Sequence, residues 1–143
     1  MKNITGTVII VDDEPGMRKA LRRLLNAEGF VVRDYASAGE FLRDERPDPP
    51  ACLVLDIAMP GINGLDVHRQ LTSMGETIPV IFLTGHGDIP MSVQAIKAGA
   101  MDFLTKPVHD EKILHAVRSA LHVAAMAAAE NEQLCMCRKR LAK

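Results

Sequence analysis

The chain has 143 residues, enough for one hydrophobic core and too few for two full domains. Its 17 basic and 18 acidic residues almost balance, so the composition gives no sign of a nucleic-acid-binding face. Three cysteines argue against a disulfide framework, and the N-terminal apolar run is too short for an export signal or a membrane span. We expect a cytoplasmic protein with no membrane contact and no direct nucleic-acid binding by this chain.

Short β-rich runs alternate with segments that have the apolar spacing of helices. The runs are TVIIV (7–11), FVVRDY (30–35), ACLVLD (51–56), PVIFLT (79–84) and MDFLTK (101–106). Several are apolar without alternation, which suits strands buried on both faces of a parallel sheet covered by helices. The clearest helical stripe consists of Met17, Ala20, Leu21, Leu24 and Leu25. The pattern predicts five βα units in a doubly wound α/β fold.

Helix boundaries are marked by residues with capping or left-handed preferences. Ser37, and Asp88 followed by Pro90, are placed to begin helices. Gly29 and Gly99 stand where helices are expected to end in a left-handed conformation.

Polar groups follow four of the five predicted strands. The first strand ends in the acids Asp12, Asp13 and Glu14, whose like charges raise one another's pKa unless a positive charge is near. The third strand ends at Asp56 and the fifth at Lys106. In open α/β sheets the ligand site lies beyond the carboxyl ends of the strands, so these groups are expected to meet there.

This set of groups fits phosphoryl chemistry with a hard cation. Carboxylates from two strand ends offer the oxygen ligands that Mg²⁺ takes together with water and phosphate. Asp56, which is followed by a turn, is expected to be an exposed carboxylate that can attack phosphorus and form an acyl phosphate. Thr84, at the end of the fourth run, and Lys106 are expected to donate hydrogen bonds to the phosphoryl oxygens.

The order of these residues resembles the receiver domain of two-component response regulators. The resemblance rests on Asp12-Asp13, Asp56 with MPG shortly after it, Thr84, and Lys106-Pro107 preceded by Phe103, and it covers about residues 6–122. It implies a flavodoxin-like (βα)5 fold with a parallel sheet of strand order 2-1-3-4-5 and helices on both faces. The stretch 83–108 resembles the FixJ-type branch, whose output is a helix-turn-helix domain, and also some receivers of sigma-54-dependent activators.

The resemblance implies a role for each residue of the motif. Asp56 would accept a phosphoryl group from the phosphohistidine of a sensor histidine kinase. Asp13, Asp56 and the backbone carbonyl of Ala58 would ligate Mg²⁺, with Asp12 acting through a water molecule or behind the ligands.

Four further residues would respond to phosphorylation or support it. Lys106 would pair with a phosphoryl oxygen, and its bond to Pro107 would be a cis peptide. Thr84 and Phe103 would form the switch pair that repacks the face of the fourth helix, fifth strand and fifth helix. The domain would thus be a regulatory phospho-acceptor rather than an enzyme, although it assists its own phosphorylation and dephosphorylation.

The division we expect is a receiver domain in residues 1–122 and a helical extension or linker in 123–143. Ala124, Ala128 and Cys135 continue a heptad-like row beyond the fifth helix, which motivates a homodimer on phosphorylation. No helix-turn-helix pattern follows, so the output DNA-binding domain would lie outside this chain.

Three other functions are possible for a chain with this predicted fold. A flavodoxin-like electron carrier fails because a flavin phosphate needs hydroxyls and amides where Asp12 and Asp13 stand. An Mg²⁺-dependent phosphohydrolase with an Asp nucleophile would carry a second acid at the position of Ala58. A phosphorylation-independent adaptor with an intact site stays open.

Overall fold

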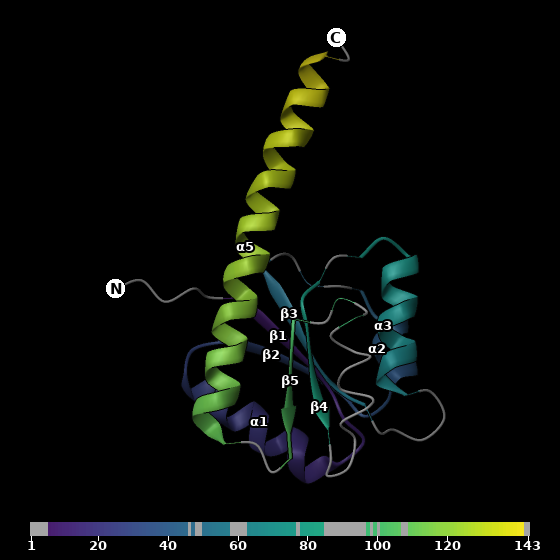
Figure 1. The fold of residues 1–143 in the computed structure, drawn as a ribbon. Coiled ribbons are helices and arrows are strands. Elements are labelled where there is room, and N and C mark those ends of the chain that lie inside the picture. Colours follow the sequence, from purple (N-terminus) through teal and green to yellow (C-terminus); the bar gives the residue numbers. More distant parts are fainter. Residues whose placement is uncertain are drawn as a thin grey trace.

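The computed structural model describes residues 6–45, 47, 50–57, 63–76, 78–84, 97, 99, 101–106 and 109–141, with side chains as far as 127. A central sheet is flanked by helices in these ranges (Figure 1). The elements are β1 Thr7–Val11, α1 Pro15–Ala27, β2 Val31–Tyr35, α2 Ala38–Arg43, β3 Ala51–Asp56, α3 Gly64–Ser73, β4 Val80–Thr84, β5 Asp102–Thr105 and α5 Asp110–Leu141. The segment between β4 and β5, where the fourth helix is predicted, lies mostly outside the described residues.

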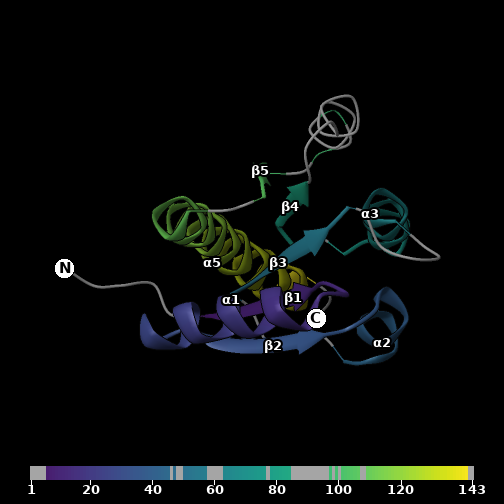
Figure 2. The same cartoon turned by 90° about the horizontal axis from the view of Figure 1, so that it is seen from below.

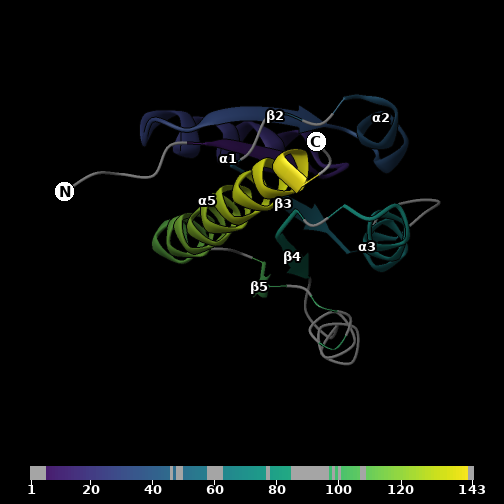
Figure 3. The ribbon, with the colours of Figure 1, turned by 90° about the horizontal axis from the view of Figure 1, so that it is seen from above.

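The five strands form one parallel sheet in the order β2-β1-β3-β4-β5. Helices α1 and α5 cover one face and α2 and α3 the other, as the views along the sheet from its two ends show (Figures 2 and 3). The predicted doubly wound flavodoxin-like fold, with strand order 2-1-3-4-5, is confirmed.

Each face of the sheet has its own apolar cluster. All six residues of β3 are buried, as expected for a central strand between two helical layers. On the α1 face, Leu21 and Leu25 are buried in the core, and Met17 and Leu24 pack against it. Ala20 is exposed, so its place in the predicted stripe is wrong: it lies at the polar edge of the helix.

The predicted helix boundaries at Ser37 and Gly29 are confirmed, and Gly99 has the predicted left-handed conformation although the helix before it lies outside the described residues. The hydroxyl of Ser37 accepts a hydrogen bond of 3.2 Å from the Glu40 amide and begins α2. Gly29 and Gly99 have φ of 92° and 103°, a left-handed conformation that glycine adopts without steric cost. Asp88 and Pro90 lie outside the described residues.

Helix α5 is continuous from Asp110 to Leu141 and extends well beyond the sheet (Figure 1). Ile113, Val117 and Leu121 bury its first part against the core. Among the described residues no helix combines the length and hydropathy needed to cross a membrane.

Candidate functional site

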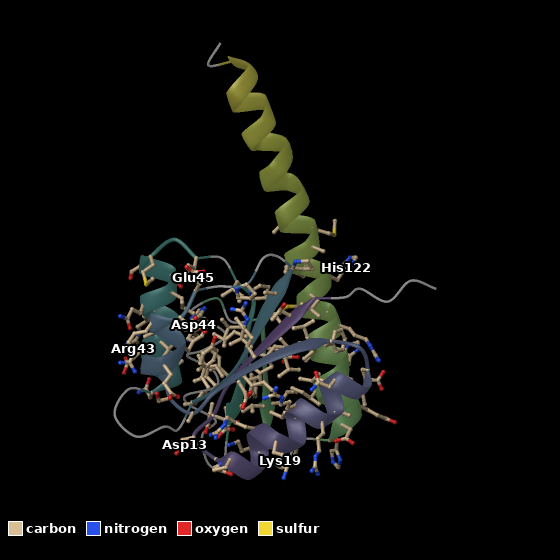
Figure 4. All side chains as sticks on the ribbon, turned by 180° about the vertical axis from the view of Figure 1, so that it is seen from behind. Asp13, Lys19, Arg43, Asp44, Glu45 and His122 are labelled. Carbon is tan, nitrogen blue, oxygen red and sulfur yellow. The ribbon has the colours of Figure 1, made fainter. Side chains whose placement is uncertain are left out.

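The carboxyl ends of four strands lie level with one another at one edge of the sheet. The parallel register pairs Val11 of β1 with Leu55 of β3, and Thr84 of β4 with Thr105 of β5. The residues that end or follow these strands therefore meet at this edge. Figure 4 shows Asp13 there, near the start of α1 and away from His122, where α5 leaves the sheet.

Three carboxylates converge at this edge. Asp12, Asp13 and Asp56 each offer an oxygen atom, and these atoms all lie within 4.8 Å of one another. Asp12 is 0% exposed and Asp56 is 3% exposed, whereas Asp13 faces solvent. The expectation that Asp56 is an exposed carboxylate is wrong, because it ends a central strand and lies against Lys106.

Lys106 supplies positive charge to the cluster. Its Nζ lies 3.2 Å from Oδ2 of Asp12 and 3.3 Å from Oδ2 of Asp56. Oε1 of Glu14 is 3.5 Å from the same nitrogen. Burial lowers the pKa of Lys106, but the Asp12 and Asp56 carboxylates outweigh that effect and raise the pKa above its ordinary value. Lys106 is therefore an ammonium at neutral pH.

The carboxylate set fits a divalent cation. Oδ2 of Asp12 is buried and accepts no hydrogen bond, so its contact with Lys106 is an ion pair without hydrogen-bond geometry. The single Lys106 ammonium is shared among the carboxylates of Asp12, Glu14 and Asp56, so negative charge remains that a divalent cation beside them would offset. Since Mg²⁺ prefers oxygen ligands and commonly takes one or two carboxylates, the donor set suits that ion.

Main-chain contacts hold the two buried acids in place. The amide of Asp12 donates to the carbonyl of Tyr35 at 3.2 Å, which continues the β1–β2 ladder by one residue. Behind Asp56, α3 begins so close that a Cβ on Gly64 would lie 2.7 Å from the Asp56 carbonyl oxygen. Only glycine therefore allows this approach.

The predicted switch residues lie on the neighbouring strands β4 and β5. Thr84 is buried, and its Oγ1 donates to the carbonyl of Leu104 at 3.5 Å, the outer limit for a hydrogen bond. Phe103 is partly buried and packs against the apolar cluster on the α2–α3 face. A hydroxyl held this weakly by β5 is available to another acceptor.

The structure thus brings together Asp12, Asp13, Asp56 and Lys106, with Thr84 on the adjoining strand end. Ala58 and Pro107 lie outside the described residues, so the carbonyl ligand and the cis peptide stay predictions. Sequence reasoning missed Arg18, whose Nη1 donates to the carbonyl oxygen of Asp12 at 2.7 Å.

Comparisons with known proteins agree with this geometry. The family model "Response regulator receiver domain" matches residues 8–118. The response regulator protein TodT of Pseudomonas putida is 48% identical over 124 residues, covering 87% of this chain and 55% of TodT. The transcriptional regulatory protein FixJ of Azorhizobium caulinodans is 43% identical over 114 residues, covering 80% of this chain and 54% of FixJ.

A solved structure of the response regulator StyR superposes with a TM-score of 0.91 at 40% identity, covering 96% of this chain and 70% of the StyR chain. The chain belongs to the response regulator receiver domain family. It spans about half the length of curated relatives such as TodT and FixJ, at 55% and 54%.

Proposed function

We propose that this domain is a phosphorylation-operated switch in which Asp56 accepts a phosphoryl group from a sensor histidine kinase. The observation that carries the proposal is the arrangement around Asp56. Its carboxylate lies with those of Asp12 and Asp13 in one cluster, and the Lys106 ammonium is 3.3 Å from its Oδ2. The groups that the proposal requires as nucleophile, cation ligands and counter-charge therefore lie close together.

In the proposed transfer, an Oδ atom of Asp56 attacks phosphorus, the bond from phosphorus to the kinase imidazole breaks, and the electron pair stays on the imidazole nitrogen. When bound, Mg²⁺ would supply positive charge that offsets the negative charge of the phosphoryl oxygens. Asp13, Asp56 and the backbone carbonyl of Ala58 would hold that ion, and Asp12 would act through a water molecule or behind the ligands. Lys106 turns from the Asp56 carboxylate to a phosphoryl oxygen as the acyl phosphate forms.

The conformational output follows from Thr84 and Phe103. The Thr84 hydroxyl exchanges its long contact with Leu104 for a phosphoryl oxygen, and Phe103 turns into the space that this movement opens. Phosphorylation shifts the population between two packings only by the difference in its interaction with each.

The downstream partner in this proposal is a DNA-binding output domain of the FixJ type that controls transcription. Residues 1–122 form the receiver and residues 123–143 the helical connection towards that output. The setting is the cytoplasm. A homodimer that forms on phosphorylation is part of the proposal, and sedimentation that shows a monomer with and without a phosphoryl mimic would remove it.

The test is intact-mass spectrometry after incubation with Mg²⁺ and acetyl phosphate, with Asp56→Asn as the matched variant. The proposal requires one phosphoryl adduct that is absent in the variant and absent when Mg²⁺ is chelated. A folded wild type that gains no adduct would support the phosphorylation-independent adaptor. Steady release of phosphate over many turnovers per minute would support the phosphohydrolase.

A further inference from the structure

Arg18 of α1 links the acidic cluster to the end of β2. Its Nη1 donates a 2.7 Å hydrogen bond to the backbone oxygen of Asp12. Its Nε lies 3.6 Å from Oδ2 of Asp34. The Arg18 side chain is 18% exposed and that of Asp34 is 25% exposed, so the link is partly shielded from water. One planar guanidinium thus joins a main-chain carbonyl of the site to a carboxylate on the neighbouring strand.

Three hydrogen bonds consequently hold Asp12 in place. Its amide donates to the carbonyl of Tyr35, its own carbonyl accepts from Arg18, and its side-chain Oδ1 accepts a 2.9 Å hydrogen bond from the Glu14 amide. The two peptide groups on either side of Asp12 therefore have set orientations. The peptide that Arg18 holds is the one that joins Asp12 to Asp13, and its plane sets where both carboxylates point.

We infer that Arg18, anchored by Asp34, is a positioning residue that orients the Asp12 and Asp13 carboxylates for the divalent cation. The inference rests on the proposed function, because it concerns the same cation site. Arg18 itself does not touch the metal or the phosphoryl group in this scheme. It acts through the backbone of Asp12.

A simple charge effect would change the Mg²⁺ affinity in the opposite direction to a loss of positioning. Arg18 is a cation beside an acidic cluster, so removing its charge alone would reduce repulsion of Mg²⁺ and tighten binding. Loss of positioning would weaken binding, as loss of groups that orient metal ligands generally does. The direction of the change in Mg²⁺ affinity therefore separates the two roles.

Arg22 provides a matched control on the same helix. Its Nη1 contacts Oδ1 of the same Asp34 at 2.7 Å, and its side chain is 53% exposed. None of its described contacts reaches Asp12. Arg22→Ala therefore removes an equal positive charge that contacts the same Asp34 carboxylate. It removes no contact with Asp12.

The experiment measures the Mg²⁺ dissociation constant of the intact chain by calorimetric titration, for wild type, Arg18→Ala and Arg22→Ala. We expect Arg18→Ala to weaken binding about 10-fold or more relative to Arg22→Ala. Arg22→Ala is expected to bind Mg²⁺ as tightly as wild type or slightly more tightly. Equal or tighter binding by Arg18→Ala than by Arg22→Ala would overturn the inference.

A second readout needs no metal. Amide hydrogen exchange of Asp12 and Glu14 in the metal-free protein reports the two hydrogen bonds that Arg18 stabilises indirectly. Both amides should exchange faster in Arg18→Ala and at the wild-type rate in Arg22→Ala, with core amides of β3 unchanged in both. Unchanged exchange at Asp12 and Glu14 in Arg18→Ala would contradict positioning.

Two further variants cover the case in which Arg18→Ala does not fold. Asp34→Asn keeps Arg18 but removes its charged anchor, so the Asp12 and Glu14 amides should exchange faster than in wild type in the metal-free protein. Arg18→Lys keeps the charge but cannot span both partners with one planar group, so rescue should be incomplete. Wild-type amide exchange in Asp34→Asn together with wild-type Mg²⁺ affinity in Arg18→Lys would overturn the inference.

Failure of the proposed function has a different signature. In that case the wild type itself gains no lasting phosphoryl group from acetyl phosphate, whether or not it binds Mg²⁺. If the wild type binds Mg²⁺ and gains the phosphoryl group, and Arg18→Ala matches Arg22→Ala, only the positioning role is lost.

Discussion

Lys106 Nζ lies 3.3 Å from Oδ2 of Asp56, although 50 positions of chain separate the two residues. The Asp56 side chain is almost fully buried, and Lys106 also contacts the buried Asp12. A buried carboxylate is tolerated only with a nearby positive charge or hydrogen-bond donors. In the metal-free protein Lys106 therefore stabilises both acids.

Replacing Lys106 with methionine should destabilise the metal-free protein by about 2 kcal/mol, less than for a fully buried pair because Lys106 is partly exposed. Mg²⁺ should restore part of this loss, since the cation offsets the same carboxylates. Urea unfolding with and without Mg²⁺ measures both effects. Lys112→Met, on the exposed side of α5, is the control and should change stability by no more than about 0.5 kcal/mol. Equal stability of the two variants without metal would contradict the role of Lys106.

Asp13→Asn should have opposite effects in the two metal states. Asp13 adds a like charge to the cluster with Asp12 and Asp56, so its removal should stabilise the metal-free protein by less than about 1 kcal/mol. The same change should abolish most of the thermal stabilisation by Mg²⁺, because a ligand is lost. Melting temperatures at increasing Mg²⁺ test this. If Mg²⁺ raises the melting temperature of the variant as much as that of wild type, Asp13 is not a ligand.

Gly64→Ala should destabilise the domain although alanine is the better helix former. The added Cβ would lie 2.7 Å from the Asp56 carbonyl oxygen and 2.9 Å from the Ile57 Cα, so backbone must move. Such overpacking costs about 1–3 kcal/mol. Because the strain falls on Asp56, phosphorylation by acetyl phosphate should also slow.

The control for that variant is Gly16→Ala, also at the start of a helix. An added Cβ there would meet nothing within 4 Å. It should leave stability unchanged or raise it by up to about 1 kcal/mol. Urea unfolding of the two variants compares them, and equal stabilities would show that the close approach of α3 to β3 relaxes without cost.

The strands were predictable because burial on both faces produces apolar runs of a recognisable length. TVIIV and ACLVLD coincide with β1 and β3 residue for residue. The run PVIFLT is one residue too long, since Pro79 has no amide hydrogen for the ladder and β4 begins at Val80. The parallel direction of the strands alone was enough to predict that the acids and Lys106 lie close together.

The burial of Asp56 and the role of Arg18 were not predictable in this way. Burial of a strand-end carboxylate depends on which side chains pack against it, and the spacing of residues does not contain that information. Arg18 looks like any cation on the polar face of α1. Its contact with Asp12 depends on the register that pairs Ile10 with Asp34 and so places the anchoring carboxylate beside β1.

His68 of α3 should make the stability of the domain sensitive to mild acid. Burial lowers the pKa of His68 below its ordinary value of 6.5, and its Nδ1 has no hydrogen-bond partner. Below about pH 6.5 the unfolded chain therefore binds a proton that the folded protein resists, so stability falls as the pH falls. The ring stacks edge to face on Phe82, with centroids 5.8 Å apart, and phenylalanine at position 68 would keep that contact.

His68→Phe should accordingly flatten the dependence of melting temperature on pH between about pH 7.5 and 5.5, a window that contains the ordinary histidine pKa. The gain over wild type should be largest at the acid end, where the wild type loses the most stability. His115→Gln is the control, since His115 is exposed on α5 and should leave the wild-type slope unchanged. Parallel curves for wild type and His68→Phe would mean that His68 takes up its proton in the folded protein as readily as in the unfolded chain.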